Sequence, residues 1–227
     1  MGRTRVKNII LLAISTFIAV STTIITVSSV IAHGNSSVGG TANGFQFFRY
    51  FTSDSNVLLA VISILVAIKS LRNILQNQDE MANWLVLLYL VGATGTTVTF
   101  LTTTLFLTPL YTSYGYGFFY LYKGSMFFMH LLNPILAIVV VVFLLEGMTF
   151  NIKHVLLSTI TVVLYSFIYA PMVLLKKWSD FYGFTFGGKV WVTPLSILMM
   201  YAAAFGIAFL LALFHNLHYK RVKGVSK

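Results

Sequence analysis

The chain has 227 residues, of which 58% are hydrophobic and only 9% are charged, and its mean hydropathy is +0.87. A soluble domain carries about 25% charged residues, so this composition excludes a soluble globule and indicates a protein surrounded by lipid. The chain has no cysteine, which excludes disulfides, thiolate metal sites and a cysteine nucleophile. Its net charge of +10 lies at the ends of apolar segments, where it is typical of membrane topology and not of nucleic-acid binding.

Long apolar segments recur along the whole chain, each near the roughly 20 residues that cross the hydrocarbon core. They predict an all-α fold, a single domain over residues 1–227 that forms a bundle of six transmembrane helices. The first segment begins with basic residues, but its apolar run of about 24 residues exceeds a signal-peptide core of roughly 7–15, so we expect it to span the membrane. The fourth and fifth segments have the shortest connection and should form an antiparallel pair. The predicted spans are 8–32, 53–72, 84–106, 126–146, 152–175 and 191–214.

Basic residues are distributed unequally between the two sides of this bundle. Positive charge gathers on the cytoplasmic side of membrane proteins, and the side that holds both termini carries most of the Lys and Arg residues. We therefore expect both termini in the cytoplasm of a cell-membrane protein, with the second, fourth and sixth helices starting at the outer side. The terminal side holds Arg3, Arg5, Lys7, Lys69, Arg72, Lys153, Lys220, Arg221, Lys223 and Lys227, and the other side holds Arg49, Lys123, Lys176, Lys177 and Lys189.

The three outward connections are rich in aromatic residues and glycine, at 44–48, 114–120 and 180–186. One explanation is an interfacial belt, because Tyr and Trp favour the headgroup level. Phe has no such preference, and glycine beside aromatic residues permits tight turns. The second interpretation is therefore a cover of aromatic rings over a cavity in the outer leaflet that suits an acyl chain.

Two polar residues lie at the same depth under this cover. Thr52 is just past the start of the second apolar segment, and His130 is about one turn into the fourth. Ionisable residues inside a membrane are expensive and are candidates for function, although a lone histidine also serves as a structural hydrogen-bond partner. A histidine within reach of a threonine hydroxyl can take its proton and make it a nucleophile. Thr52 and His130 are therefore the candidate catalytic pair.

Four further residues are candidates for lining the same pocket or stabilising an oxyanion. Asn56 is one helical turn beyond Thr52 and shares its face, and Asn133 is one turn beyond His130. Asp54 either caps the second helix, where an acid is favourable, or orients His130. Ser55 lies between Asp54 and Asn56 in the chain.

We expect neither a metal nor a cofactor. His215 and His218 have a spacing that metal sites use, but no carboxylate or third histidine accompanies them. The chain contains no zinc-protease, nucleophile-elbow or phosphate-loop motif.

The segment from Phe48 to Asn56, followed by a helix with His130 and Pro134, resembles the bacterial Pr6Pr family of integral membrane proteins. That family is distantly similar to the androgen-induced gene 1 and FAR-17a proteins, and the resemblance covers nearly the whole chain as six spans. In the eukaryotic relatives an intramembrane threonine and a histidine hydrolyse esters of fatty acids with hydroxy fatty acids. The resemblance places the threonine on Thr52 and the histidine on His130.

Two functions follow as hypotheses. The first is an intramembrane lipid ester hydrolase that uses Thr52 and His130 on fatty-acyl esters from the outer leaflet. The second is a non-catalytic binder of a membrane lipid, an acyl chain or a small molecule, which acts as a transporter or regulatory subunit and uses His130 as a polar anchor. Both predict a membrane lipid as the partner, and neither predicts nucleic acid.

Overall fold

A computed structural model describes residues 3–31, 44–78, 81–183, 185–186 and 189–224. The described residues form helices and connections without a strand, and six of the helices are long and apolar enough to cross a membrane. This confirms the predicted all-helical class and the six apolar spans. The observed spans are Thr4–Ile31, Phe51–Gln76, Asn83–Ser113, Ser125–Leu144, Ile152–Leu174 and Thr193–Lys223.

Several spans consist of more than one helical element. Three spans are single continuous helices, namely α1 (Arg3–Ile31), α2 (Phe51–Gln76) and α9 (Thr193–Lys223). The third joins α3 (Asn83–Thr102) through a π-helical turn to α4 (Thr108–Ser113), and the fifth joins α7 (Ile152–Ser158) to α8 (Ile160–Leu174). The fourth span begins with α5 (Ser125–Phe127) and continues through a π-helical turn (Phe128–Leu132), α6 (Asn133–Val139) and a second π-helical turn (Val140–Leu144).

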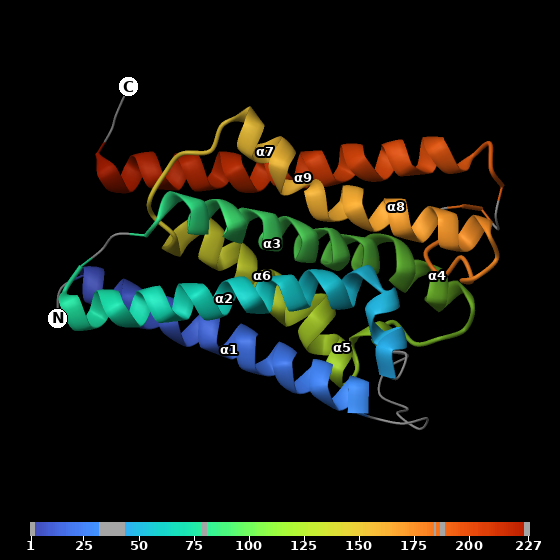
Figure 1. The fold of residues 1–227 in the computed structure, drawn as a ribbon, viewed down its shortest axis with the longest axis horizontal. Coiled ribbons are helices and arrows are strands. Elements are labelled where there is room, and N and C mark those ends of the chain that lie inside the picture. Colours follow the sequence, from blue (N-terminus) through green and yellow to red (C-terminus); the bar gives the residue numbers. More distant parts are fainter. Residues whose placement is uncertain (1–2, 32–43, 79–80, 184, 187–188, 225–227) are drawn as a thin grey trace.

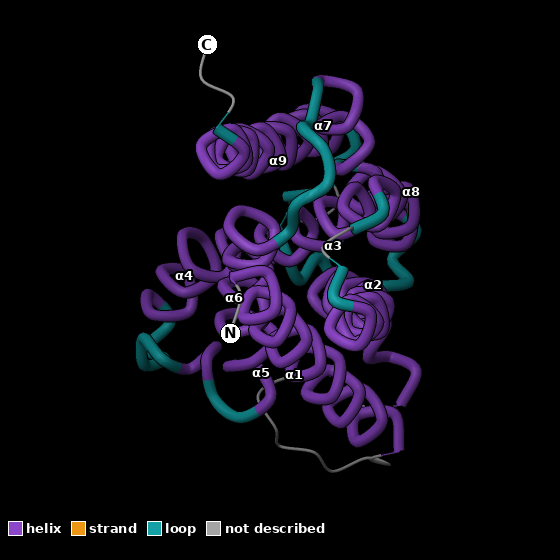
Figure 2. The backbone as a smooth tube through the Cα atoms, turned by 90° about the vertical axis from the view of Figure 1, so that its left-hand side faces the viewer, coloured by secondary structure: helices purple, strands orange, loops and turns teal. Residues whose placement is uncertain are grey.

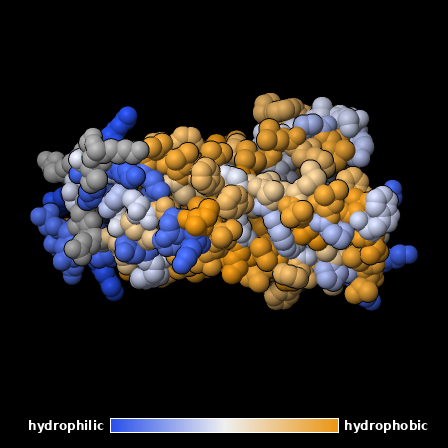
Figure 3. All heavy atoms as spheres, turned by 90° about the horizontal axis from the view of Figure 1, so that it is seen from above, coloured by the Kyte–Doolittle hydropathy of each residue, from blue (hydrophilic) through white to orange (hydrophobic). Residues whose placement is uncertain are grey.

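The third span forms the centre of the bundle. Figures 1 and 2 show α3 between the α1–α2 layer and the α8–α9 layer, with α6 alongside. Gly92 and Gly95 let α2 approach closely, because a Cβ at Gly92 would meet Leu59 and one at Gly95 would meet Ser55, both at 3.2 Å. Hydrophobic side chains cover the middle of the long axis and hydrophilic ones gather towards its ends (Figure 3), as a membrane-crossing bundle requires.

Two predictions about the spans need correction. The second, third and sixth spans end later than predicted, at Gln76, Ser113 and Lys223, because the helical backbone hydrogen bonds continue past the apolar stretch from which the spans were predicted. The fourth and fifth spans do not form the expected packed pair. Instead, the fourth packs against α3 and α9, and α7 packs against α3 and α9 as well.

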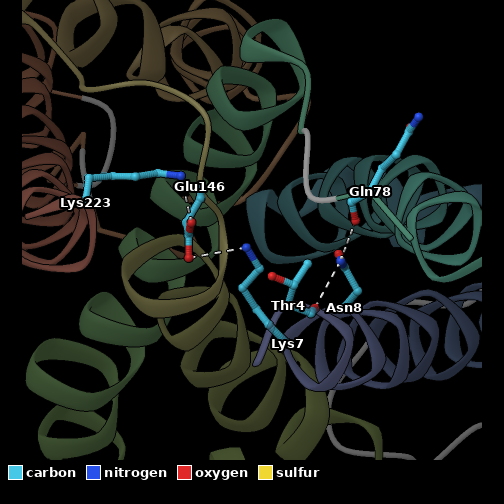
Figure 4. Close-up of polar contacts among 6 residues, drawn as sticks. All are labelled: Thr4, Lys7, Asn8, Gln78, Glu146 and Lys223. Carbon is cyan, nitrogen blue, oxygen red and sulfur yellow. Dashed lines mark hydrogen bonds and ion pairs between the residues drawn. The ribbon is translucent and has the colours of Figure 1, made fainter. Parts of the chain in front are cut away.

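The described ends of α1 and α9 lie together at one end of the bundle (Figure 1). Glu146, just after the fourth span, accepts from Lys7 of α1 at 3.2 Å and lies 3.6 Å from Lys223 of α9. Nearby, the Asn8 amide donates to the carbonyls of Thr4 and Gln78 (Figure 4). These contacts link four spans at the end of the bundle that carries most of the positive charge.

Candidate functional site

Thr52 is the second residue of α2. The helix begins at Phe51, after Tyr50 in an extended conformation, so the Thr52 side chain leaves the first helical turn. This side chain is buried and hydrogen-bonds to the side chain of Tyr182, which belongs to the connection between α8 and α9. The nucleophile candidate therefore lies at the end of the bundle opposite the described ends of α1 and α9 (Figure 1), beside the aromatic connection that contains Tyr182.

His130 lies in the π-helical turn of the fourth span. Asn133 donates its backbone N–H to the carbonyl of Phe128, five residues back, and Pro134 has no N–H to donate to the carbonyl of His130. Such π-helical turns occur frequently at functional sites. The His130 side chain is almost fully buried.

One cavity brings Thr52 and His130 together. Its volume is about 140 Å³, enough for a few water molecules at ~30 Å³ each. Ser53 also lines it, and most of the remaining wall is aromatic or aliphatic. The lining residues are Tyr50, Thr52, Ser53, Leu107, Tyr111, Tyr120, Leu121, Met126, His130, Phe181 and Tyr182.

A backbone carbonyl orients the His130 ring. The Nδ1 atom lies 2.8 Å from the carbonyl oxygen of Leu121, which can only accept, so Nδ1 carries the proton and donates it. In the neutral ring this leaves the lone pair on Nε2, the atom that can act as a base. The geometry therefore supplies the tautomer that proton abstraction requires without a carboxylate partner.

Tyr182 is a site residue that sequence reasoning did not single out. Its hydroxyl oxygen accepts from the Phe51 N–H at 3.0 Å and is bonded to the Thr52 side chain. Burial raises the pKa of Tyr182 to about 12, so the hydroxyl keeps its proton at physiological pH and remains a donor. The only signal for it in the sequence is the aromatic and glycine-rich stretch 180–186.

Asp180 holds the Tyr182 segment in place. One carboxylate oxygen accepts from the Tyr169 hydroxyl at 2.6 Å, and the other accepts from the backbone and side chain of Thr185 at 2.9 and 2.7 Å. The Tyr169 hydroxyl in turn accepts from the backbone N–H of Tyr182 at 3.1 Å. Hydrogen bonds therefore hold the segment around Tyr182 to Tyr169 of α8 and to Phe51 at the start of α2.

Asn56 and Asn133 lie in a buried network and are not among the residues that line the cavity. The Asn56 amide donates to the carbonyls of Thr52 at 2.8 Å and Met129 at 3.1 Å. Met129 is free to accept because its usual partner, the N–H of Asn133, bonds to Phe128 in the π-helical turn. Asn56 thus ties the turn that carries Thr52 to the residue next to His130.

Asn133 extends this network to α1. Its amide donates to the Thr22 hydroxyl at 3.0 Å and to the Asn56 side-chain oxygen at 3.3 Å, and its own oxygen accepts from Ser21 at 3.3 Å. Both asparagines therefore have their amide groups engaged in joining helices. They position the candidate pair, whereas an oxyanion donor would need a free N–H at the cavity wall.

Asp54 and Ser55 also lie outside the cavity wall. Asp54 is in the first turn of α2, where an acid is favourable, but the helix has no side-chain capping bond. Ser55 donates to the Thr52 carbonyl at 3.3 Å, bonds to the Thr99 hydroxyl at 3.2 Å and packs against Gly95. Its contacts are those of a residue at a close helix–helix crossing.

No group of three His, Asp or Glu side chains in the described part of the chain could hold a metal ion. Fold and cavity together define a six-span helical bundle with a Thr–His pair beneath an aromatic cover. Comparison of the chain with protein-family models, with curated proteins and with solved structures finds no match.

Proposed function

We propose that this chain is an intramembrane hydrolase of fatty-acyl esters that resides in the cell membrane with both termini in the cytoplasm. The observation that carries the proposal is the shared cavity, in which Thr52 faces the same space as a histidine whose Nδ1 is bound to a carbonyl. The resemblance of the segments around Thr52 and His130 to the Pr6Pr family supports the same chemistry.

The proposed reaction has two halves. In the first, Nε2 of His130 takes the proton of the Thr52 hydroxyl, the oxygen attacks the ester carbonyl carbon, and the alcohol leaves with the proton from His130. In the second, water loses a proton to His130 and attacks the acyl-threonine carbonyl carbon. The bond to the Thr52 oxygen then breaks, His130 gives its proton to that oxygen, and the fatty acid is released. The hydroxyl of Tyr182 is the proposed donor to the oxyanion in both halves.

The size of the cavity limits what it can enclose. At about 140 Å³ it has room for an ester group and its nearest carbons, but not for whole acyl chains. Leu107 and Met126, on the third and fourth spans, form an apolar part of the wall. We propose that the ester enters between these spans from the outer leaflet while its chains remain in lipid.

A non-catalytic lipid binder remains the second candidate. The observation that favours it is the absence of a carboxylate among the residues that line the cavity, since many nucleophile–histidine pairs use one to orient the ring. In this case His130 would be a polar anchor for the head of a bound lipid.

Labelling by a fluorophosphonate separates the two candidates. Membranes that contain the protein are treated with a long-chain fluorophosphonate, and peptide mass spectrometry locates the adduct. We expect it on Thr52, because only an activated hydroxyl displaces the fluoride. Ser53, which lines the same cavity, is the internal control. An adduct on Ser53 at the same yield, or none on either residue, would support the binder.

Removing the Tyr182 hydroxyl tests its role as oxyanion donor. Tyr182→Phe should lower kcat for hydrolysis of a long-chain 4-nitrophenyl ester by about 10²-fold with little change in KM, as expected for a donor that acts in the transition state. The matched control is Tyr165→Phe, which removes a buried hydroxyl that donates to the Arg49 carbonyl at 2.7 Å. Equal losses in the two variants would assign Tyr182 a purely structural role.

A further inference from the structure

A second and larger cavity runs along α9, away from the Thr52 site. Its volume is about 630 Å³, within the range of small-molecule sites, and it shares no residue with the cavity of Thr52 and His130. Most of its wall is aliphatic or aromatic, and polar side chains gather at one end. The lining residues are Thr97, Leu101, Ile138, Val142, Phe143, Ile207, Leu210, Leu211, Phe214, Leu217, His218 and Arg221.

The groove is long enough to hold an acyl chain of one leaflet of a bilayer. From Ile207 to Arg221 the helix rises about 21 Å, somewhat more than half of the ~30 Å hydrocarbon core. Phe143, Phe214 and Leu217 are each about half exposed along it, so the groove is accessible from the lipid side. A single acyl chain lying along α9 would cover these side chains.

At the end of the groove lies a positive charge that has no acidic partner among the described residues. Arg221 is exposed, lines the groove and makes no ion pair with a described residue. Among the described residues, Glu146 is the acid at this end of the bundle, and it is already bound by Lys7 and Lys223 (Figure 4). Asp54 and Asp180 belong to the opposite end, near the start of α2 and after α8.

We propose that the groove binds an anionic phospholipid from the leaflet that surrounds the terminal ends of α1 and α9. One acyl chain lies between α9 and the third and fourth spans, and the phosphate pairs with Arg221. A guanidinium suits phosphate because its N–H groups form a planar fork. A zwitterionic lipid offers the same chain and phosphate but no net charge, so the preference for an anionic headgroup is the property that Arg221 determines.

Native mass spectrometry of the purified full chain in a neutral detergent tests this site. The protein is mixed with equal amounts of phosphatidylglycerol and phosphatidylcholine that have the same acyl chains. We expect phosphatidylglycerol to be retained about fivefold better, the preference that one basic residue at a membrane surface provides. Arg221→Gln should reduce this preference to below about twofold, whereas Lys220→Gln, which removes the same charge from a residue outside the groove, should leave it intact.

A second pair of variants tests the chain-binding part independently of charge. Leu210→Trp fills the groove and should lower retention of both lipids, whereas Leu213→Trp, on α9 outside the groove, should not. The proposal is overturned if the wild-type protein shows no headgroup preference, or if the Arg221 and Lys220 variants lose it equally. If Arg221→Gln does not fold, equal retention by the two Trp variants overturns the proposal.

Discussion

Replacing Thr52 with alanine should reduce ester hydrolysis by at least about 10³-fold, because the proposed acyl-enzyme cannot form without the hydroxyl. The assay is fatty-acid release from a long-chain 4-nitrophenyl ester in detergent or nanodiscs. Thr52→Ser keeps a hydroxyl in the same turn of α2 and should retain a measurable rate. The matched control is Ser70→Ala, which removes a buried hydroxyl from the same helix without a hydrogen-bond partner.

A double variant shows whether the two residues act as a unit. If His130 activates Thr52, His130→Gln alone should cost about as much as Thr52→Ala, and the double variant should be no worse than either. Additive losses would indicate two separate roles. A Thr52→Ala protein that keeps the wild-type rate would eliminate the proposed nucleophile, whereas loss in the Ser70→Ala control would show that the assay reports on folding instead.

The fold could be predicted from the sequence because lipid leaves few alternatives. In the hydrocarbon core each segment must satisfy its own backbone bonds, so apolar stretches near 20 residues become helices. Packing partners are different, because they depend on side-chain contacts between distant segments. The fourth and fifth spans have a short connection, yet His215 and Asn216 of α9 bind that connection, and both spans pack against α9.

The candidate pair could also be found from the sequence, whereas the role of its neighbours could not. Helical periodicity places Asn56 on the same helix face as Thr52. The structure agrees, because the Asn56 side-chain amide donates to the Thr52 backbone carbonyl. What periodicity cannot predict is that Pro134 sits beside a π-helical turn, which leaves the Met129 carbonyl free for Asn56. This local change in backbone bonding turns a predicted pocket residue into a link between two helices.

The aromatic cover was predicted as a feature of three connections without knowledge of which rings face the cavity. Loop conformation decides that, and no periodic pattern encodes it. Tyr182 reaches Thr52 because Asp180 binds Tyr169 and Thr185, which holds the segment against α8. The available signal was the aromatic and glycine-rich stretch 180–186.

The largest effect on stability is expected at His215, which is fully buried on α9. Its Nδ1 lies 2.6 Å from the carbonyl oxygen of Val141 and its Nε2 lies 2.9 Å from that of Met148. Val141 is in the last turn of the fourth span, where carbonyls lack helical partners. The ring also packs on Phe150, with centroids 4.5 Å apart. His215 therefore joins α9 to the end of the fourth span and to the connection that follows it.

His215→Leu roughly preserves the side-chain volume but removes the ring nitrogens that face the Val141 and Met148 carbonyls and with them the N–H donor of the ring, so it should lower the free energy of unfolding by about 3 kcal/mol. Reversible unfolding in mixed detergent micelles measures this. His218→Leu is the matched control, because the same substitution one turn later removes only an edge contact with Phe143 at 5.3 Å and should cost less than about 1 kcal/mol. Equal losses in the two variants would contradict a special role for the contacts of the His215 ring with the two carbonyls.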